Sequence, residues 1–256
     1  YPLTYKLIDD IDGNASLFVV IILVFFSGEL IWRDRNSKIN EVIDSTPHIS
    51  LISLSAKTLS LISLTVLLQI FFIFCGIIYQ LVNGYFRIEL EIYFLDFFYA
   101  NFLTYVIWSG VMITIQVLVN NKYLGYFVSV AVIFIWSVIL EIFDVSSFML
   151  IIAAGPSTLY SDMNAFGPGL YGAMMFNLYW ILFSILCLLI AGALWNRGLH
   201  SSLKERISIA KKQVPRNYRP LIFGTGIVWI LVTSFVFYNT QILNPYKTND
   251  EYEQVA

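Results

Sequence analysis

The side chains that could do chemistry in this chain gather in one charged stretch, SGELIWRDRNSKINEVIDSTPH, at residues 27–48. It stands between the apolar runs LFVVIILVFF and LISLTVLLQIFFIFCGIIY. On a helical wheel its apolar side chains share one arc, which predicts an amphipathic helix ended by Pro47. Such a helix can rest on lipid or dock a cytoplasmic subunit, and composition leaves both interpretations open. The charged residues that a subunit would contact are Glu29, Arg33, Arg35, Lys38 and Glu41.

A second group of polar side chains falls within or beside the apolar runs. An ionisable group inside a span costs about 2.5–3.5 kcal/mol on insertion scales, so each should face protein or water. Asp96 and Glu141 could line the outer mouth of a translocation path, although a position at the headgroups is the simpler explanation. Asn177 lies deeper, where polar residues more often join helices by hydrogen bonds than bind substrate.

The sequence lacks the motifs of the common hydrolytic sites. It has no H-E-x-x-H, whose two histidines would hold zinc, and no G-x-x-x-x-G-K-[ST] loop to cradle phosphates. Its two cysteines lie within apolar runs and its two histidines are far apart, so neither a disulfide framework nor a metal site is indicated. We therefore expect that the chain is not itself an enzyme and holds no cofactor.

The elements that must position these residues are apolar helices. Hydrophobic residues make up 58% of the chain and charged residues only 12%, too few to cover a soluble domain of 256 residues. Long apolar runs recur near the roughly 20 residues that a helix needs to cross a bilayer. These features predict an all-α, polytopic transmembrane bundle with six spans, at about 15–30, 58–82, 92–119, 124–143, 174–195 and 220–238.

The basic residues predict the orientation. Twelve of the fifteen Lys and Arg residues fall in segment 28–57, at Lys122 or in segment 196–219. Six spans place these three segments on one face, which the positive-inside rule makes cytoplasmic, with both ends outside. The basic segment 196–219 predicts a surface helix on anionic lipid. The net charge of −2 gives no attraction to nucleic acid.

Segment 144–173 is the irregular part of the pattern. Its apolar stretch FMLIIAAG is too short to cross the membrane and is followed by Pro156, Gly167, Pro168 and Gly169. This pattern predicts a short re-entrant or interfacial element on the outer side, with an ordinary outer loop as the alternative. The chain begins at Tyr1 without a basic leader, and we expect it to be a piece of a longer product rather than to carry a cleavable signal peptide.

Stretch 27–57 resembles the segment after the second span of ABC-2 type exporter permeases. A Gly-Glu pair, an Arg-rich turn, a Glu, a Pro and a Lys that opens the next helix follow in the same order. The chain is most similar to large permeases of this type that are fused to an M1-family aminopeptidase domain. The supporting motifs are VNNKYLGYF, YSDMNAFG followed by NLYW, LWNRG and FYNTQILNPYKTNDEYE.

The resemblance implies a division of the chain and a function. Residues 1–195 would be a permease domain lacking its first span, 196–219 a cytoplasmic loop, 220–238 an additional helix and 239–256 a linker toward an external domain. The chain would belong to a cell inner-membrane exporter, paired with another permease half or a second copy. A separate ATP-binding subunit, docked on the amphipathic coupling helix, would bind and hydrolyse the ATP. The rival interpretation is a membrane anchor for an external peptidase, without transport.

Overall fold

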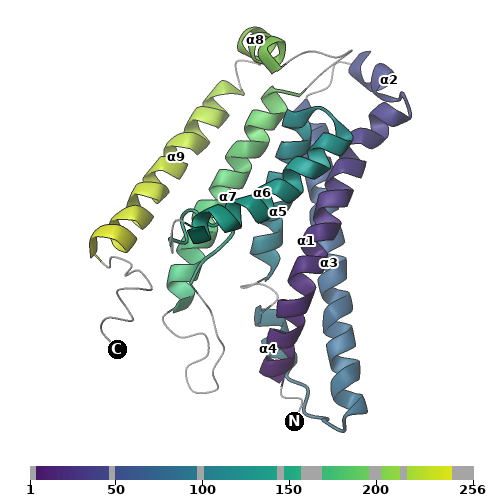
Figure 1. Ribbon diagram of the computed structural model, residues 1–256, viewed down its shortest axis with the longest axis vertical. Helices are drawn as coiled ribbons and strands as arrows, with labels where there is room; N and C mark the ends of the chain where they lie inside the picture. The colour runs from purple at the N-terminus through teal and green to yellow at the C-terminus, as the bar shows by residue number, and fades with distance from the viewer. Residues whose placement is uncertain are drawn as a thin grey trace.

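The computed structural model describes residues 4–45, 50–96, 101–142, 147–156, 169–195, 203–213 and 218–243. Within these residues the fold is all-α and contains no strand (Figure 1). A short π-helical turn, Tyr238–Leu243, follows the last α-helix. The α-helices are α1 (Thr4–Asn36), α2 (Asn40–Ser45), α3 (Ser50–Val82), α4 (Leu90–Asp96), α5 (Leu103–Val119), α6 (Lys122–Ile142), α7 (Gly169–Ala193), α8 (Leu203–Gln213) and α9 (Arg219–Phe237).

Five of these helices are long and apolar enough to cross a membrane: α1, α3, α6, α7 and the helix formed by α9 with its π turn. A sixth, α5, is equally apolar but has only 17 residues. At 1.5 Å per residue it spans about 26 Å, close to the thickness of the hydrocarbon core. The described helices therefore indicate a multi-pass membrane protein, with the spans near the positions that the apolar runs predict.

The distribution of side chains on α3 agrees with a lipid environment. Thr65 and Gln69 are buried, whereas Leu67 and Phe71 are more than half exposed. Water favours the opposite arrangement, with polar side chains outside. In lipid, small and polar residues pack between helices while apolar ones face the acyl chains. The exposed face of α3 is thus the one that lipid would cover.

Whether the predicted third span at 92–119 is continuous stays a prediction. The described residues cover it with α4 and α5, and residues 97–100 between these helices lie outside the described part. Ile92 and Tyr93 of α4 pack with Ile8 of α1, well away from the centre of the bundle. The apolar side chains of α4 therefore make a contact with the first turns of α1.

Helices α1 and α3 are longer than their predicted spans. Each has 33 residues, or about 50 Å, against about 30 Å of hydrocarbon core. The additional turns of α3, residues 50–57, lie at the upper end of Figure 1, whereas the first turns of α1 meet α4 at the lower end, where α3 also ends. There Gln80 donates to the Thr4 hydroxyl at 3.1 Å and accepts from the Tyr93 hydroxyl at 3.1 Å. This hydrogen-bonded group fixes the two long helices to each other at that end.

The charged stretch 27–48 is not the single amphipathic helix that its pattern predicts. Helix α1 runs through it without a break to Asn36, and α2 begins at Asn40. Between them Lys38 takes a left-handed backbone conformation, with φ of 57°, which ends the helix. The Ser37 hydroxyl donates to the carbonyl of Arg33 at 2.8 Å and so satisfies part of the helix end. Residues 46–49, with Pro47, lie outside the described part.

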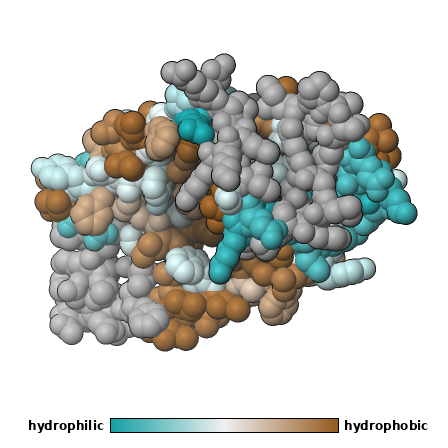
Figure 2. Space-filling view, turned by 90° about the horizontal axis from the view of Figure 1, so that it is seen from above, coloured by the Kyte–Doolittle hydropathy of each residue, from teal (hydrophilic) through white to brown (hydrophobic). Residues whose placement is uncertain are grey.

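The three basic segments meet at one end of the bundle, as the span count predicts. Helix α2, helix α8 and the turn between α5 and α6 lie at the upper end of Figure 1, whereas α1 begins at the lower end and α9 runs downward to end about halfway. Figure 2, which looks onto the upper end, shows hydrophilic residues gathered there with hydrophobic residues along the sides. Which side of the membrane this end faces stays a prediction.

The described part of the irregular segment, residues 147–156, forms turns rather than a helix. Its Phe148, Met149 and Ile152 pack against the buried aromatic residues of α7 and against Val236 of α9. The Trp136 indole donates to the Leu150 carbonyl at 2.7 Å. These turns rest on the helices, and their depth relative to a membrane stays a prediction. Residues 157–168, with the motif YSDMNAFG, lie outside the described part.

Candidate functional site

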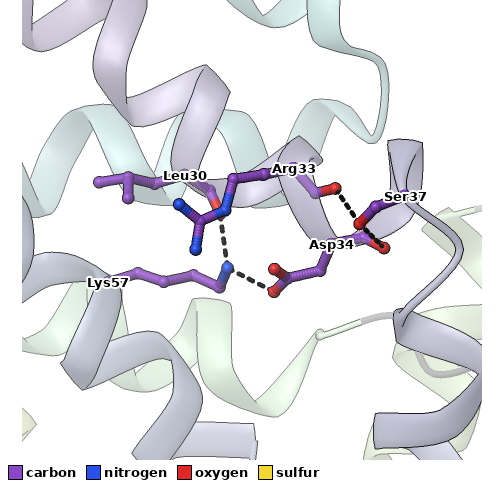
Figure 3. Close-up of polar contacts among 5 residues, drawn as sticks. All are labelled: Leu30, Arg33, Asp34, Ser37 and Lys57. Atoms are coloured by element: carbon purple, nitrogen blue, oxygen red, sulfur yellow. Dashed lines mark hydrogen bonds and ion pairs between the residues drawn. The ribbon is translucent and has the colours of Figure 1, made fainter.

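The last turns of α1 carry the first of three polar ties that join this helix to its neighbours. Lys57, in the second turn of α3, places its ammonium 2.6 Å from the Asp34 carboxylate and 2.5 Å from the Leu30 carbonyl (Figure 3). The Lys57 and Asp34 side chains are 12% and 26% exposed. A pair so withdrawn from water is screened less than a surface pair, so it holds α1 against α3.

The second tie joins α1 to α6. The Glu29 carboxylate lies 2.5 Å from the Lys122 ammonium at the first residue of α6. One turn further along α6, the Tyr126 ring packs directly on Gly28, where a larger residue would leave no room for it. The ion pair and the ring contact therefore fix the start of α6 against α1.

The third tie reaches the turn between α5 and α6. The Arg35 guanidinium donates to the Asn120 side-chain oxygen at 2.6 Å and lies 4.8 Å from the centre of the Trp32 ring. This geometry fits a cation–π contact. The Trp32 indole in turn donates to the Gln116 side-chain oxygen at 3.3 Å. Gln116 thus joins α5 to α1 by a hydrogen bond.

Two asparagines explain why α5 can turn directly into α6. Asn120 ends α5 in the left-handed region, with φ of 54°, which asparagine tolerates better than most residues. The Asn121 side-chain oxygen accepts from the backbone N–H groups of Tyr123 and Leu124, each at 3.1 Å, and so caps the start of α6. The motif VNNKYLGYF thus builds the tight turn to which Arg35 is bonded.

Arg206 adds a fourth tie from outside the bundle. Although α8 is a surface helix, the Arg206 side chain is only 4% exposed. Its guanidinium donates to the carbonyls of Leu194, Val117 and Leu118, with the first two of these bonds at 2.8 and 2.9 Å. Burial, together with the nearby charge of Arg35, lowers the pKa of Arg206. A cation at the carboxyl ends of α5 and α7 satisfies carbonyls that have no helical partner.

The structure therefore divides the residues predicted to contact a subunit. Glu29 and Arg35 are bonded to other parts of the chain, with the Glu29 side chain still 54% exposed, whereas Arg33, Lys38 and Glu41 are exposed and lie outside the three ties. Ile39 and Val42, beside them, are also exposed, at 52% and 68%. We call these five exposed residues the α1–α2 platform. It combines both charge signs with an apolar centre, a composition that suits a protein contact as well as a lipid surface.

The structure describes the residues predicted for a translocation path only in part. Asp96 is the last residue of α4 and Glu141 belongs to the last turn of α6, but their side chains lie outside the described part. Asn177 is half-buried on α7, next to Phe176 of the core. The structure does not bring these three together into a described site, and their role stays a prediction.

The sequence could have revealed part of what was missed. Adjacent asparagines are a recognised turn signal, so the Asn120–Asn121 turn was within reach. The ion pair of Asp34 with Lys57 could not be predicted without knowing that α1 packs on α3. Nothing in its spacing distinguishes Arg206 from the other basic residues of segment 196–219.

The geometry defines an all-helical, multi-pass membrane protein with a tied polar layer at one end. No protein-family model, curated protein or solved structure matches this chain.

Proposed function

We propose that this chain is the membrane-spanning permease portion of an ABC-2 type exporter. It moves a substrate with energy from ATP that a separate subunit binds and hydrolyses. The observation that carries the proposal is the position of the α1–α2 platform: it is exposed, yet it follows directly on helix turns bonded to α3, α6 and the α5–α6 turn. A push on the platform reaches all of these helices through short bonds.

This arrangement suits a moving part better than a passive one. Asp34–Lys57, Glu29–Lys122 and Arg35–Asn120 connect one helix end to three neighbours, so the four elements shift together. Packed interfaces respond to such a push by switching between discrete arrangements. An exporter needs this response at the face where its ATPase subunit binds, and a second permease half or copy completes the pathway.

The rival function is a membrane anchor that holds an external M1-like peptidase domain near the surface. An anchor also needs stable helices, so the internal ties fit both functions. It needs no platform for a subunit, however. Replacement of Arg33 and Lys38 separates the two functions, because the side chains of these two platform residues do not belong to the three internal ties.

The test is a pull-down of the full-length protein, solubilised in mild detergent from its native membrane. The variant R33E/K38E reverses two exposed platform charges and leaves the three internal ties in place. We expect an ATP-binding subunit to copurify with the unchanged protein and to be lost from this variant. R87E is the matched control, because Arg87 is an exposed arginine in the connection between α3 and α4, which lies at the opposite end of the bundle.

Equal recovery of the subunit with R33E/K38E and R87E contradicts docking at the platform. Absence of any ATP-binding subunit from the unchanged protein, under conditions that preserve other exporters, favours the anchor.

A further inference from the structure

One face of α8 points away from the bundle. The helix lies across the upper end of the molecule, above α7 and α9 (Figure 1). Arg206 is buried, whereas Lys204 and Ser208, which are four residues apart, are exposed. At about 3.6 residues per turn, each of these two lies about 160° around the helix from Arg206. We call positions 204 and 208 the outward face of α8, because a bilayer around the apolar middle of the bundle lies on the opposite side.

The contacts of Arg206 hold α8 in a fixed position. Its guanidinium donates to the carbonyls of Val117 and Leu118 at the end of α5, and to the carbonyl of Leu194 just beyond α7. Hydrogen bonds from a charged donor are stronger than those between neutral groups. The outward face is therefore ordered before any partner arrives, which lowers the entropic cost of a contact there.

The base of the α1–α2 platform and the base of α8 are bonded to the same part of α5. Arg35, at the end of α1, donates to the Asn120 side chain, while Arg206 donates to the carbonyls of Val117 and Leu118. Residues 117 to 120 span only about 4.5 Å along a helix. Burial and then the nearby charge of Arg35 lower the pKa of Arg206, in agreement with this proximity. A protein that covers the platform therefore has α8 beside it.

The platform and α8 connect to different helices of the bundle. The three ties below the platform reach α3, α6 and the turn between α5 and α6. The bond from Arg206 to Leu194 reaches the end of α7 instead. A partner that contacts both surfaces therefore acts on α7 together with the helices that the platform moves.

We infer that the outward face of α8 is a second contact surface for the ATP-binding subunit that docks on the α1–α2 platform. The inference rests on the proposed function and extends its docking site. Anionic lipid is the other occupant that a basic helix suggests. The side of α8 toward the bilayer holds Arg206, however, and each guanidinium nitrogen of Arg206 is already bonded to a carbonyl. Lys204 faces the side on which a cytoplasmic subunit would lie.

The experiment is photo-crosslinking of the full-length protein in its native membrane. A phenylalanine analogue with a benzophenone group replaces one residue at a time: Lys204 or Ser208 on the outward face, Val42 on the platform, or Arg87 at the opposite end of the bundle. All four positions are exposed. We expect Lys204, Ser208 and Val42 to crosslink to the same ATP-binding subunit, and Arg87 to give no such product.

A charge variant measures the same contact by pull-down. K204E should lower recovery of the ATP-binding subunit by roughly 2- to 5-fold, the effect of losing one exposed charged contact. K6E is the matched control, because Lys6 is an exposed lysine in the first turns of α1, at the opposite end, and it should leave recovery unchanged.

The outcomes separate this inference from the proposed function. Crosslinks to the subunit from Val42, but from neither Lys204 nor Ser208, overturn the inference and leave the proposed function in place. Crosslinks from the outward face to lipid or to an unrelated protein also overturn it. If Val42 gives no product with an ATP-binding subunit, docking at the platform fails and the inference fails with it.

Discussion

Arg206 lies on the same surface helix as the exposed Lys204, yet its guanidinium is buried against the carboxyl ends of α5 and α7. Arg206 is thus a side chain from outside the bundle that contacts two of its central helices, α5 and α7. Its three carbonyl acceptors belong to residues 117, 118 and 194, which are the ends of helices that the sequence separates widely. The residue therefore stabilises helix packing rather than a lipid contact.

Replacing Arg206 tests this role at the scale of one residue. R206M should lower the free energy of unfolding by about 2–3 kcal/mol, because the carbonyls of Val117, Leu118 and Leu194 lose bonds to a charged donor. The free energy of unfolding of R206K should fall between those of R206M and the unchanged protein, since lysine keeps the charge but not the planar guanidinium group. Thermal unfolding in detergent measures the order of the variants. K204M should unfold like the unchanged protein, and an equally small effect of R206M would contradict the role.

At the scale of elements, the contact of α1 with α6 depends on a residue without a side chain. A Cβ at Gly28 would overlap the Tyr126 ring, whose hydroxyl also donates to the Phe25 carbonyl at 3.4 Å. Gly13, on the same helix, has no atom within 4 Å of such a Cβ. The two glycines of α1 thus differ in what surrounds them and not in their own chemistry.

This difference predicts opposite outcomes for the same substitution. G28A should destabilise the protein by about 1–3 kcal/mol through overpacking against Tyr126. G13A should be neutral or stabilising by up to about 1 kcal/mol, because alanine loses less backbone entropy in a helix. Unfolding temperatures of the two variants, measured side by side, check the prediction. A loss of stability in G13A as large as in G28A would show that α1 tolerates no alanine.

The scale of elements also shows what the sequence could and could not predict. Apolar runs located the helices because a helix that crosses lipid must be apolar along its length, and this is the property that the runs display. They could not locate the first turns of α1, where Lys6 and Asp10 interrupt the apolar pattern in a part stabilised by α4. Nor could periodicity predict the break at Lys38, because lysine rarely adopts a positive φ.

At the scale of the whole molecule, α1 and α3 are joined by polar contacts at both of their ends. A charged layer joins them at the upper end, and a smaller polar cluster joins them at the lower end. The upper layer holds Asp34–Lys57 and the lower cluster holds Thr4, Gln80 and Tyr93. The arrangement divides the molecule into two polar ends separated by an apolar middle. A bilayer imposes this division on any bundle that crosses it.

The predicted orientation can be tested with single cysteines in a chain in which Cys75 and Cys187 are replaced by alanine. K38C at the upper end should react with a membrane-impermeant maleimide only after the cells are opened. R87C at the lower end should react in intact cells, because the basic end is predicted to be cytoplasmic. Both positions are exposed, so access to water is matched. The reverse pattern of labelling would invert the orientation and place the platform outside.

The length of α1 has a mechanical consequence. A rigid helix of about 50 Å, held at its charged end by three bonds, acts as a lever whose far tip is Thr4. A tilt of about 5° at the platform displaces that tip by about 4 Å, a distance greater than the reach of a hydrogen bond. Gln80 must then follow Thr4 or release it. A small rotation on one side of the membrane is thereby converted into the opening of a contact on the other.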